Sequence, residues 1–431
     1  MPKTDCDVLV IGAGLAGAIT ARELTARGLR VMILEARERA GGRVRTERHW
    51  DRAVDLGGQT LHWLQPHIWA ELTRYGIDTY RWPAADMALL RRLDGDVQSL
   101  DIADMGARMS SALAAFYADA RKHFPLPYNP LSGTDLGAVD CISVAERLRA
   151  FDFGPITGDL VQAALEVNFN GPITEGAYTQ GLRRTSLAMG EARFLPEVVS
   201  FRPVGGMMRL LTAVLDSARA DVRLGQAVIK VDQSADAVQI TTADGQTVTA
   251  RRAVCTAPLS ALSEVNFQPG LSAGKRAFIA AGQVNRGVML WIELDGTHDP
   301  FMAYAPGSRT LTFMRTDQTT ARGVTLQAFG MDATALDPND TNQVQAAVRQ
   351  WLPKAVVRAS VGHDWINDPY SRQMWTMLKP GQLTGLLPQM QCPEGLVHFA
   401  GTDVANGWAG YFDGAIESGF TAARAVAIGL T

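Results

Sequence analysis

The chain has 431 residues, of which 47% are hydrophobic and 20% charged, the composition of an ordinary folded globular protein. This length exceeds the size at which one hydrophobic core stops growing, so two domains are expected. The net charge of −3 argues against a nucleic-acid partner, which would favour a basic face.

The four cysteines, Cys6, Cys141, Cys255 and Cys392, lie far apart and form no C-x-x-C pair. This spacing indicates neither a zinc site nor a disulfide framework, and the histidines show no metal-binding pattern. No apolar run approaches the roughly 20 residues of a membrane span, and the first residues lead directly into a strand. We therefore expect no metal, no membrane partner and a cytoplasmic location.

The first forty residues are predicted to form a strand, a glycine turn, a helix and a second strand. The apolar run "DVLVIG" (7–12) and the run "LRVMILE" (29–35) are typical of buried parallel strands. Between them, Ala16, Ile19, Thr20 and Leu24 recur at helical spacing, and Gly28 stands where the helix would end. This pattern predicts a βαβ unit in a doubly wound parallel sheet.

The turn carries G-x-G-x-x-G, formed by Gly12, Gly14 and Gly17. In a dinucleotide-binding turn, the first glycine makes the bend, the second admits a pyrophosphate and the third lets helix and strand pack closely. The helix N-terminus would supply amide donors and a positive dipole to the phosphates. Glu35 ends the second strand, where an acid would bind ribose hydroxyls.

The stretch that follows, "LEARERAGGRVRT" (34–46), adds a second glycine-arginine element. Gly41 and Gly42 would permit close approach to the pyrophosphate, and Arg43 would add a bidentate phosphate contact. A nicotinamide enzyme does not need this element, so the cofactor is predicted to be FAD. Ala36 and Arg37 are assigned to the same site, although Arg37 can instead face solvent or pair with an acid.

Farther along the chain, residues 87–189 have a mainly helical pattern, and residues 222–258 alternate as strands with turns. Strands are expected at 287–294, 310–315 and 323–330, a helix at 342–352, and a last strand and helix at 396–401 and 410–428. The two domains are therefore predicted to be interleaved. The FAD-binding domain is assigned to residues 1–76, 201–272 and 377–431, and the substrate domain to residues 77–200 (helical) and 273–376 (sheet plus helix).

Over nearly its whole length the sequence resembles the flavin-containing amine oxidases, the monoamine oxidase-like family. The resemblance rests on "VIGAGLAG", "DLGGQTLH", "GGMMRLL", "QAVIKVDQ", "AVCTAP" and, most specifically, "HDWINDPYSRQMW" with "HFAGTDVANGWAGYFDGA". Within the family it is most similar to the bacterial 6-hydroxynicotine oxidases. The fold implied is α/β, with a Rossmann-like FAD domain interleaved with an α+β substrate domain.

The resemblance assigns further cofactor contacts around the flavin ring, ribityl chain and adenine, namely Gly57, Gly58, Gln59, Val228, Trp365, Gly401, Asp403, Gly410, Tyr411, Phe412 and Ala415. The N-terminus of the final helix would stabilise negative charge on a reduced flavin. Some relatives bind FAD covalently through a cysteine in the segment that here reads "YSRQMW". Because Met374 replaces that cysteine, we expect non-covalent FAD.

For substrate binding, the resemblance places Trp375 and Tyr411 as an aromatic pair in front of the flavin. His62 and Asn168 are weaker pocket candidates. Arg286 stands where the family commonly has a lysine that holds a water against flavin N5. An arginine at this position is expected to orient water differently or to meet an anionic substrate group, with a structural ion pair as the alternative.

The resemblance implies oxidation of a small-molecule amine by hydride transfer from its α-carbon, followed by imine hydrolysis. O2, giving H2O2, is the expected acceptor, with another electron acceptor as the alternative. The favoured substrate is a cyclic secondary amine such as 6-hydroxynicotine. Rival interpretations are an L-amino-acid or polyamine oxidase, a flavin desaturase or porphyrinogen oxidase, and a non-catalytic flavin-binding protein. Both a monomer and a homodimer remain open.

Overall fold

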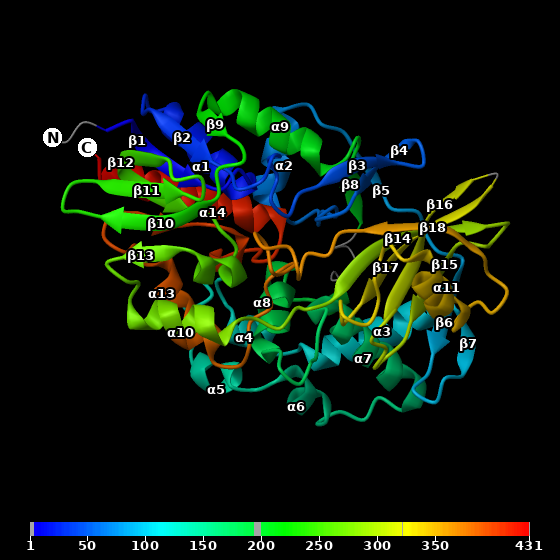
Figure 1. The fold of residues 1–431 in the computed structure, drawn as a ribbon. Helices are drawn as coiled ribbons and strands as arrows, with labels where there is room; N and C mark the ends of the chain where they lie inside the picture. The colour runs from blue at the N-terminus through cyan, green and yellow to red at the C-terminus, as the bar shows by residue number, and fades with distance from the viewer. Residues whose placement is uncertain (1–3, 194–199, 321, 431) are drawn as a thin grey trace.

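The computed structural model describes residues 4–193, 200–320 and 322–430. The molecule has two lobes, each built on its own β-sheet, with a layer of helices running beneath both (Figure 1). The N- and C-termini lie together at the outer edge of the first lobe. The predicted α/β architecture is confirmed.

The first sheet is assembled from segments far apart in the chain. Its strands are β1 (Cys6–Ile11), β2 (Val31–Leu34), β9 (Asp221–Arg223), β10 (Val228–Gln233), β11 (Val238–Thr242), β12 (Thr247–Cys255), β13 (Asn266–Gln268) and β19 (Val397–Phe399). Within the described residues they run in the order β13-β10-β11-β12-β1-β2-β9, and β19 pairs with the end of β12. Beginning, middle and end of the chain thus share one sheet, and the domain boundaries themselves stay a prediction.

Strand β1 lies between β2 and β12, parallel to both, and its residues are almost fully buried. Helices α1 (Leu15–Thr25), α9 (Met207–Ala218) and α14 (Phe412–Ile428) cover this part of the sheet. The βαβ unit predicted from the sequence is therefore present, and Gly28 ends its helix with a φ of 81°.

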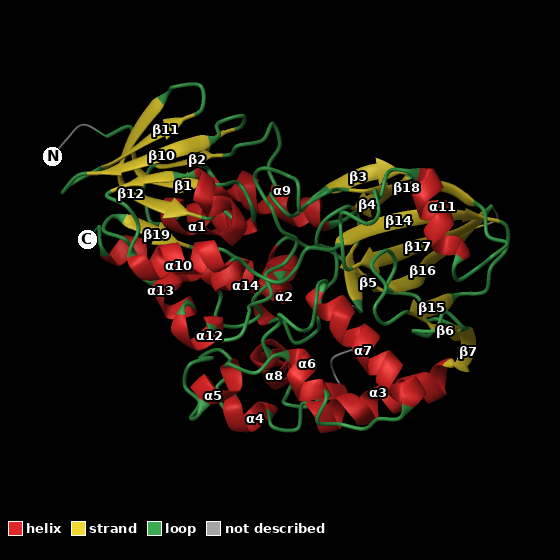
Figure 2. Ribbon diagram, turned by 60° about the horizontal axis from the view of Figure 1, so that its bottom comes forward, coloured by secondary structure: helices red, strands yellow, loops and turns green. Residues whose placement is uncertain are grey.

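The second sheet forms the other lobe. Its strands are β6 (Met87–Arg91), β7 (Val97–Asp101), β14 (Val288–Asp295), β15 (Phe301–Tyr304), β16 (Phe313–Thr320), β17 (Gly323–Gly330) and β18 (Val357–Gly362), in the order β18-β14-β17-β16-β15-β6-β7. Helix α11 (Thr341–Arg349) packs on one face through Val344 and Val348. The opposite face looks toward helices α3 (Ile102–Phe116) and α7 (Pro155–Phe169) (Figure 2).

Shorter elements complete the described fold. Two ribbons, β3 (Thr46–His49) with β4 (Arg52–Asp55) and β5 (Thr79–Arg81) with β8 (Phe201–Pro203), lie near the junction of the lobes. The remaining helices are α2 (Pro66–Arg74), α4 (Ala120–His123), α5 (Leu136–Asp140), α6 (Val144–Leu148), α8 (Tyr178–Leu187), α10 (Ala273–Ala281), α12 (Gln382–Gly385), α13 (Leu387–Gln391) and the 3-10 turns η2 (Leu259–Glu264) and η3 (Thr402–Val404).

One part of the sequence interpretation was wrong: the region 77–200 is not only helical. Strands β6 and β7 form a hairpin that extends the second sheet, and β6 pairs in parallel with β15. The turn between them contains Asp94 and Gly95, the latter with a φ of 91°. This Asp-Gly pair is a recognised hairpin signal, but the flanking runs are short and bear several charges, which weakened their strand pattern.

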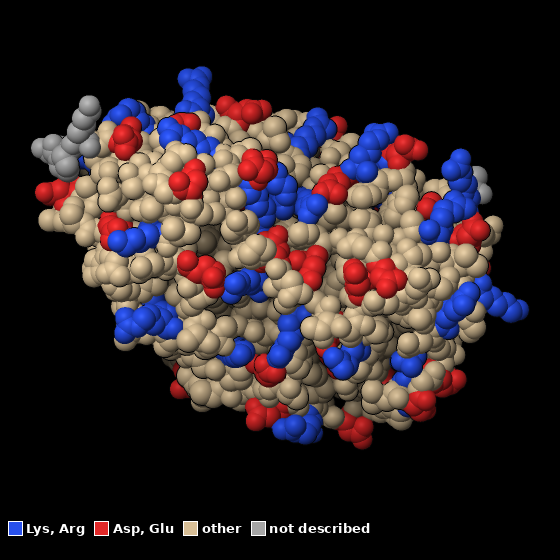
Figure 3. All heavy atoms as spheres, in the orientation of Figure 1, with Lys and Arg blue, Asp and Glu red and all other residues tan. Residues whose placement is uncertain are grey.

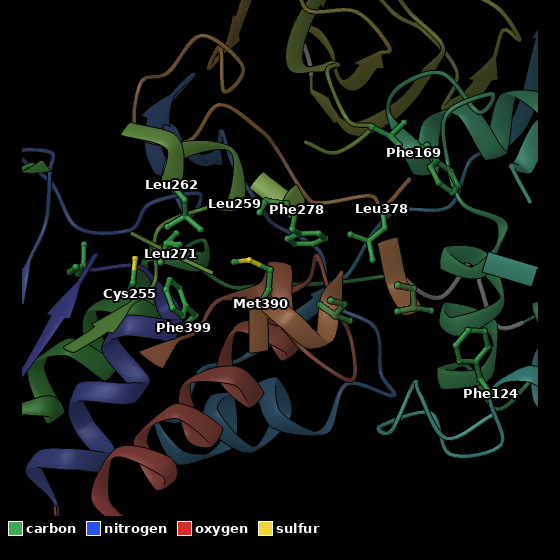
Figure 4. Close-up of a cluster of buried hydrophobic side chains, with 14 of the residues drawn as sticks. Phe124, Phe169, Cys255, Leu259, Leu262, Leu271, Phe278, Leu378, Met390 and Phe399 are labelled. Carbon is green, nitrogen blue, oxygen red and sulfur yellow. The ribbon is translucent and has the colours of Figure 1, made fainter. Parts of the chain in front are cut away.

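A continuous hydrophobic core joins the first sheet to the helical layer. Figure 4 shows Cys255 and Phe399 from the sheet, Phe278 from α10 and Phe169 from α7 as parts of one cluster. Phe278, Cys255 and Phe169 are at most 1% exposed. This packing anchors the helical layer to the first sheet, whereas the second sheet has a hydrophobic core of its own.

Gly17 is required by the fold itself. A Cβ built on it would lie 2.1 Å from the Gly12 carbonyl oxygen and 3.2 Å from a Val10 methyl group, so α1 could not pack on β1. We predict that Gly17→Ala lowers the free energy of unfolding by about 1–3 kcal/mol, measured by thermal or urea denaturation. The matched control is Gly137→Ala in α5, where a Cβ would meet nothing within 4 Å. Equal stability of the two variants would contradict this packing argument.

Candidate active site

A cavity of about 900 Å³ runs from the glycine turn of the first lobe to the inner face of the second sheet. At one end it is lined by Gly12, Gly14 and Glu35, and at the other by Tyr304 and Phe313. Most of the exposed wall is apolar, and the elements around it come from every part of the chain. It is therefore long enough in principle for an extended cofactor with a second molecule beyond it.

The glycine turn opens onto this cavity. Gly14 is the N-cap of α1 and makes no side-chain cap, which leaves the helix N-terminus open to a ligand. A Cβ on Gly14 would meet nothing closer than 3.8 Å in the protein, and the same holds for Gly42. Packing within the protein leaves room for a side chain at Gly14. The space that glycine leaves free there is therefore available to a ligand in the cavity.

Glu35 closes the turn. Its Oε2 atom accepts a hydrogen bond of 2.9 Å from the Ala13 amide, and its Oε1 atom accepts one of 3.1 Å from the Arg37 amide. Arg37 lines the cavity and is paired, as the sequence allowed, with Asp368 and with Glu35 at 3.7 Å. Burial raises the pKa of Asp368, but bonds from His363 and Arg37 outweigh it and hold the pKa at about 2. This ion-pair group fixes the wall beside Glu35.

Another part of the cavity wall is formed where two glycines pack against aromatic rings. A Cβ on Gly58 would lie 2.6 Å from the Phe412 ring, and one on Gly57 would lie 3.2 Å from Trp365. The Trp365 indole donates a 2.9 Å hydrogen bond to the Leu56 carbonyl. Gln59 donates to the Met289 sulfur at 3.2 Å, while its buried Oε1 atom has no partner among the described atoms. This unpaired amide oxygen can accept a hydrogen bond from a polar group of a ligand.

The C-terminal segment supplies a second open helix N-terminus. Tyr411 is the N-cap of α14, and like Gly14 it provides no side-chain cap. The preceding loop is closed by a 3.2 Å bond from the Gly410 amide to the Thr402 carbonyl and by a 2.7 Å bond from the Thr402 hydroxyl to the Tyr411 carbonyl. The α14 dipole therefore meets the cavity wall close to Gly410.

Trp375 and Tyr411 are neighbours on the cavity wall. A Cβ on Gly410 would lie 3.6 Å from the Trp375 Cβ. The Trp375 indole donates a 3.0 Å hydrogen bond to the Asn168 carbonyl, and Phe329 packs edge-on against its ring with centroids 6.0 Å apart. Trp375 thus lies beside Gly410, the residue that precedes Tyr411, and both aromatic residues line the cavity; their joint role toward a substrate stays a prediction.

Of the predicted cofactor residues, all but two line the cavity; Gly17 packs against β1 instead, and the second exception is Asp403. Those that line the cavity are Gly12, Gly14, Glu35, Ala36, Arg37, Gly41, Gly42, Arg43, Gly57, Gly58, Gln59, Val228, Trp365, Gly401, Gly410, Tyr411, Phe412 and Ala415. Asp403 lies behind the wall: its carboxylate accepts from Arg43 at 2.8 Å, from the Leu259 amide at 2.9 Å and from Gln373 at 2.9 Å. Asp403 therefore holds Arg43, the start of η2 and Gln373 together, and its predicted contact with the ribityl chain stays a prediction.

Two predicted pocket residues are placed elsewhere. Arg286 precedes β14, is half exposed and forms an ion pair with Glu175 on the surface, so it does not line the cavity. His62 is fully buried outside the lining; it accepts a 3.0 Å bond from the Leu64 amide and packs on Trp408. Arg286 therefore matches the alternative stated from the sequence, a structural ion pair. Asn168, by contrast, does line the cavity, and its amide oxygen accepts from Arg184.

The far end of the cavity was missed by the sequence interpretation. It is formed by alternate residues of the second sheet and by one face of α3, namely Met289, Met302, Tyr304, Phe313, Arg315, Gln327 and Phe329 with Met105, Met109 and Leu113, and Trp82 also lines it. The inner residues of these strands are buried on both faces, because α11 covers the face away from the cavity, so burial gave no alternating pattern that marked the cavity side. The buried polar residues Arg315 and Gln327 were the available signal.

Within the described ranges, no group of three histidine, cysteine or acidic residues is arranged to hold a metal ion. In the same ranges, none of the helices combines the length and apolar character needed to cross a bilayer. The site therefore consists of open helix ends, glycines, arginines and aromatic rings.

A βαβ glycine turn with an acid after its second strand, a second glycine-arginine element and a long cavity define a dinucleotide-binding oxidoreductase of the flavin type. The donors and free space fit FAD: two open helix N-termini, side-chain-free positions at Gly14 and Gly42, and the unpaired Gln59 oxygen.

Comparison with known proteins agrees. The family model for flavin-containing amine oxidoreductases matches residues 15–427. Nicotine dehydrogenase of Pseudomonas putida is 32% identical over 98% of this chain and 88% of its own length. (S)-6-hydroxynicotine oxidase of Paenarthrobacter nicotinovorans is 28% identical over 97% and 99% of the two chains. A solved triple mutant of putrescine oxidase superposes with a TM-score of 0.85 at 19% identity, covering 99% of each chain.

The chain belongs to the flavin-containing amine oxidoreductase family. Membership implies FAD as the cofactor and an enzyme that oxidises amine donors. The resemblance noted in the sequence is thereby confirmed, including its similarity to a 6-hydroxynicotine oxidase.

We predict that Glu35→Ala weakens FAD binding by about 1–3 kcal/mol, because the variant loses a charge-assisted acceptor at the end of β2. The measurement is FAD titration of the apoprotein, followed by flavin fluorescence. Glu38→Ala is the matched control, since Glu38 is exposed three residues away and does not line the cavity. Thermal unfolding of the apoproteins separates loss of affinity from loss of structure. Unchanged FAD affinity would place the ribose elsewhere.

We predict that Arg286→Ala leaves the rates of flavin reduction and reoxidation within about twofold of the wild type, because an exposed ion pair contributes little. Stopped-flow absorbance measures both half-reactions. A selective change in reoxidation would show that Arg286 reaches the cavity in solution and would restore the sequence-based assignment.

Proposed function

We propose that this protein is an FAD-dependent amine oxidase in which the amine lies between Trp375 and Tyr411. The observation that carries the proposal is that both aromatic residues line the cavity, with Trp375 beside Gly410 at the open N-terminus of α14. When bound there, FAD supplies the two-electron acceptor for the hydride of the amine α-carbon.

The protein contributes orientation and desolvation. An alkylamine with a pKa near 10 is mostly protonated at pH 7, and neutralising it costs about 4 kcal/mol. A dry slot between two aromatic faces disfavours the ammonium form and so lowers this cost. Cation–π attraction opposes the effect by about 0.5–2 kcal/mol, so burial has to dominate. The ring faces also restrict the orientation of the α-C–H bond.

The second half of the reaction takes place on the released product. Loss of hydride converts the neutral amine to an iminium ion, which gives up its N–H proton to solvent to form the imine. Water then hydrolyses this product to a carbonyl compound and an amine. We propose O2 as the final acceptor, with H2O2 formed. A separate electron acceptor is the alternative, and it is favoured by the name "dehydrogenase" of the relative at 32% identity.

The proposed substrate is a secondary amine attached to an aromatic or heteroaromatic ring. This choice is supported by the names of the nicotine and 6-hydroxynicotine enzymes among the relatives and by the aromatic floor formed by Tyr304, Phe313 and Phe329. Linear polyamines are less compatible with a cavity end where the described lining residues include arginines and no acid. If the protein is instead a non-catalytic flavoprotein, it should retain FAD that none of the amines reduces.

We predict that Tyr411→Ala and Trp375→Ala each slow anaerobic flavin reduction by amine at least about tenfold while FAD stays bound, because the α-C–H bond loses its alignment. Stopped-flow spectroscopy with N-methyl arylalkylamines, cyclic amines, polyamines and amino acids measures the rates and identifies the substrate class.

Trp63→Ala provides a matched aromatic control, because Trp63 is 46% exposed and lies outside the cavity lining. Its reduction rate should equal that of the wild type. If both cavity variants also reduce at that rate, the two rings serve packing and the amine binds elsewhere. Reduction by none of the amines in a protein that retains FAD would reject the oxidase proposal.

A further inference from the structure

Asp413 is an acid in the first turn of α14, yet its carboxylate caps a different helix. The residue is 0% exposed, and its side chain reaches across to the start of α2. Oδ1 accepts a 2.9 Å hydrogen bond from the Ile68 amide, and Oδ2 lies 2.9 Å from His67 Nδ1 and 3.5 Å from the Tyr128 hydroxyl. The carboxylate therefore satisfies an amide in the first turn of α2 and joins the N-termini of two helices.

The charge of Asp413 lies close to the cavity. The donors around it are those that an ionised carboxylate accepts. Tyr411, Phe412 and Ala415 line the cavity and stand within one helical turn of Asp413, roughly 5 Å along the helix axis. In the proposed function the amine lies at Tyr411, so the flavin ring that accepts the hydride lies at this end of α14. Asp413 therefore opposes the stabilisation that the helix N-terminus gives to negative charge on the ring.

His67 is placed to neutralise this carboxylate. Its side chain is 29% exposed, so it can exchange protons with solvent while Nδ1 faces Asp413. The hydrogen bond to Asp413 raises the pKa of His67, and together with the negative charges nearby it outweighs burial, which lowers that pKa. The imidazolium form is therefore present below about pH 6.5, the ordinary pKa of histidine, and is lost as the pH rises through the raised value.

The described groups that face His67 from the surrounding elements are acidic or uncharged. They are Glu71 on α2, Glu417 and Phe420 on α14, and Tyr128 on the loop after α4. Arg22 donates to Glu71 at 2.8 Å, and Glu417 accepts from the amides of residues 406 and 407 at 3.1 and 2.8 Å. Burial raises the pKa of Tyr128, so its hydroxyl stays uncharged. The protonation of His67 therefore decides whether Asp413 is neutralised.

Charges on the outer surface act more weakly on α14. On the face drawn in Figure 3, basic and acidic side chains are interspersed, so their fields partly cancel at a distance and are screened by salt. The buried carboxylate of Asp413 is screened much less. A change in the charge of its partner is therefore felt at the first turn of the helix.

We propose that His67 is a positioning residue for flavin reduction: through its bond to Asp413, its charge sets how strongly the N-terminus of α14 stabilises the reduced flavin. The proposal rests on the amine oxidase function, because that function places the flavin ring at α14. With His67 protonated the pair is neutral, and the helix stabilises negative charge on the ring. When His67 loses its proton, the charge of Asp413 makes reduction less favourable.

The test measures the midpoint potential of FAD in the holoenzyme against reference dyes, from about pH 5.5 to about pH 9 and without an amine. His67→Gln keeps a polar side chain that cannot take up a proton. Below the pKa of His67, reduction of the wild type should be about threefold to tenfold more favourable than that of His67→Gln, which is roughly 14–30 mV for a two-electron couple. The difference should disappear as the pH rises through that pKa.

His49→Gln is the matched control, because His49 also lies beside a carboxylate, with Nε2 3.2 Å from Glu47, and neither residue lines the cavity. Its potentials should follow those of the wild type at every pH. Asp413→Asn removes the charge with little change of shape, so its potential should exceed that of His67→Gln. Adding His67→Gln to Asp413→Asn should then cause no further shift, since the two residues act as a pair.

Coincident potentials of the wild type and His67→Gln throughout the pH range would overturn the proposal. A constant difference between them would also overturn it, because a structural change does not titrate. These potentials are measured without an amine, so they test the pair even if none of the amines reduces the flavin, and a negative result leaves the oxidase proposal standing. If Asp413→Asn does not fold, the curves of His67→Gln and His49→Gln decide the question.

Discussion

The backbone hydrogen bonding of β12 is the constraint on which the rest of the molecule depends. Its first half pairs with β11, its second half with β19, and its other edge with β1, so segments about 250 and 150 residues away converge on one strand. The carboxyl ends of β1 and β12 then open toward the same cavity, which Thr256 lines directly after β12. Open α/β sheets bind ligands at this edge.

The two ends of the cavity are lined by different kinds of residue. Its first-lobe end has open helix N-termini, glycines and the anchored Glu35, which suit the charged part of a dinucleotide. Its far end is lined by apolar and aromatic side chains with the buried arginines Arg184 and Arg315. In the proposed function, this desolvated surface lowers the pKa of a bound amine. The proposal thus places cofactor and amine in different parts of one cavity.

Several residues with strong sequence signals have structural roles instead. Gly17 belongs to the fingerprint but contacts β1 and not the cavity, as its assigned packing role requires. Asp403 acts behind the wall by holding Arg43 and the start of η2. His62 and Arg286 were assigned to the pocket by motif position, but both lie in loops, His62 before α2 and Arg286 before β14, where no regular period predicts the direction of a side chain. The motifs predicted which part of the fold these residues lie in, but not which way their side chains point.

The sequence by itself determined the βαβ unit, the FAD site and the family, because glycine spacing, a strand-ending acid and apolar runs are local patterns with local causes. It also located Trp375 and Tyr411, through motifs that are contiguous in the chain. Only the tertiary structure decided which face of the second sheet lines the cavity and that Arg315 and Gln327 stand together there. That pairing joins two strands whose register depends on long-range backbone hydrogen bonds, and strands buried on both faces carry no local pattern to reveal it.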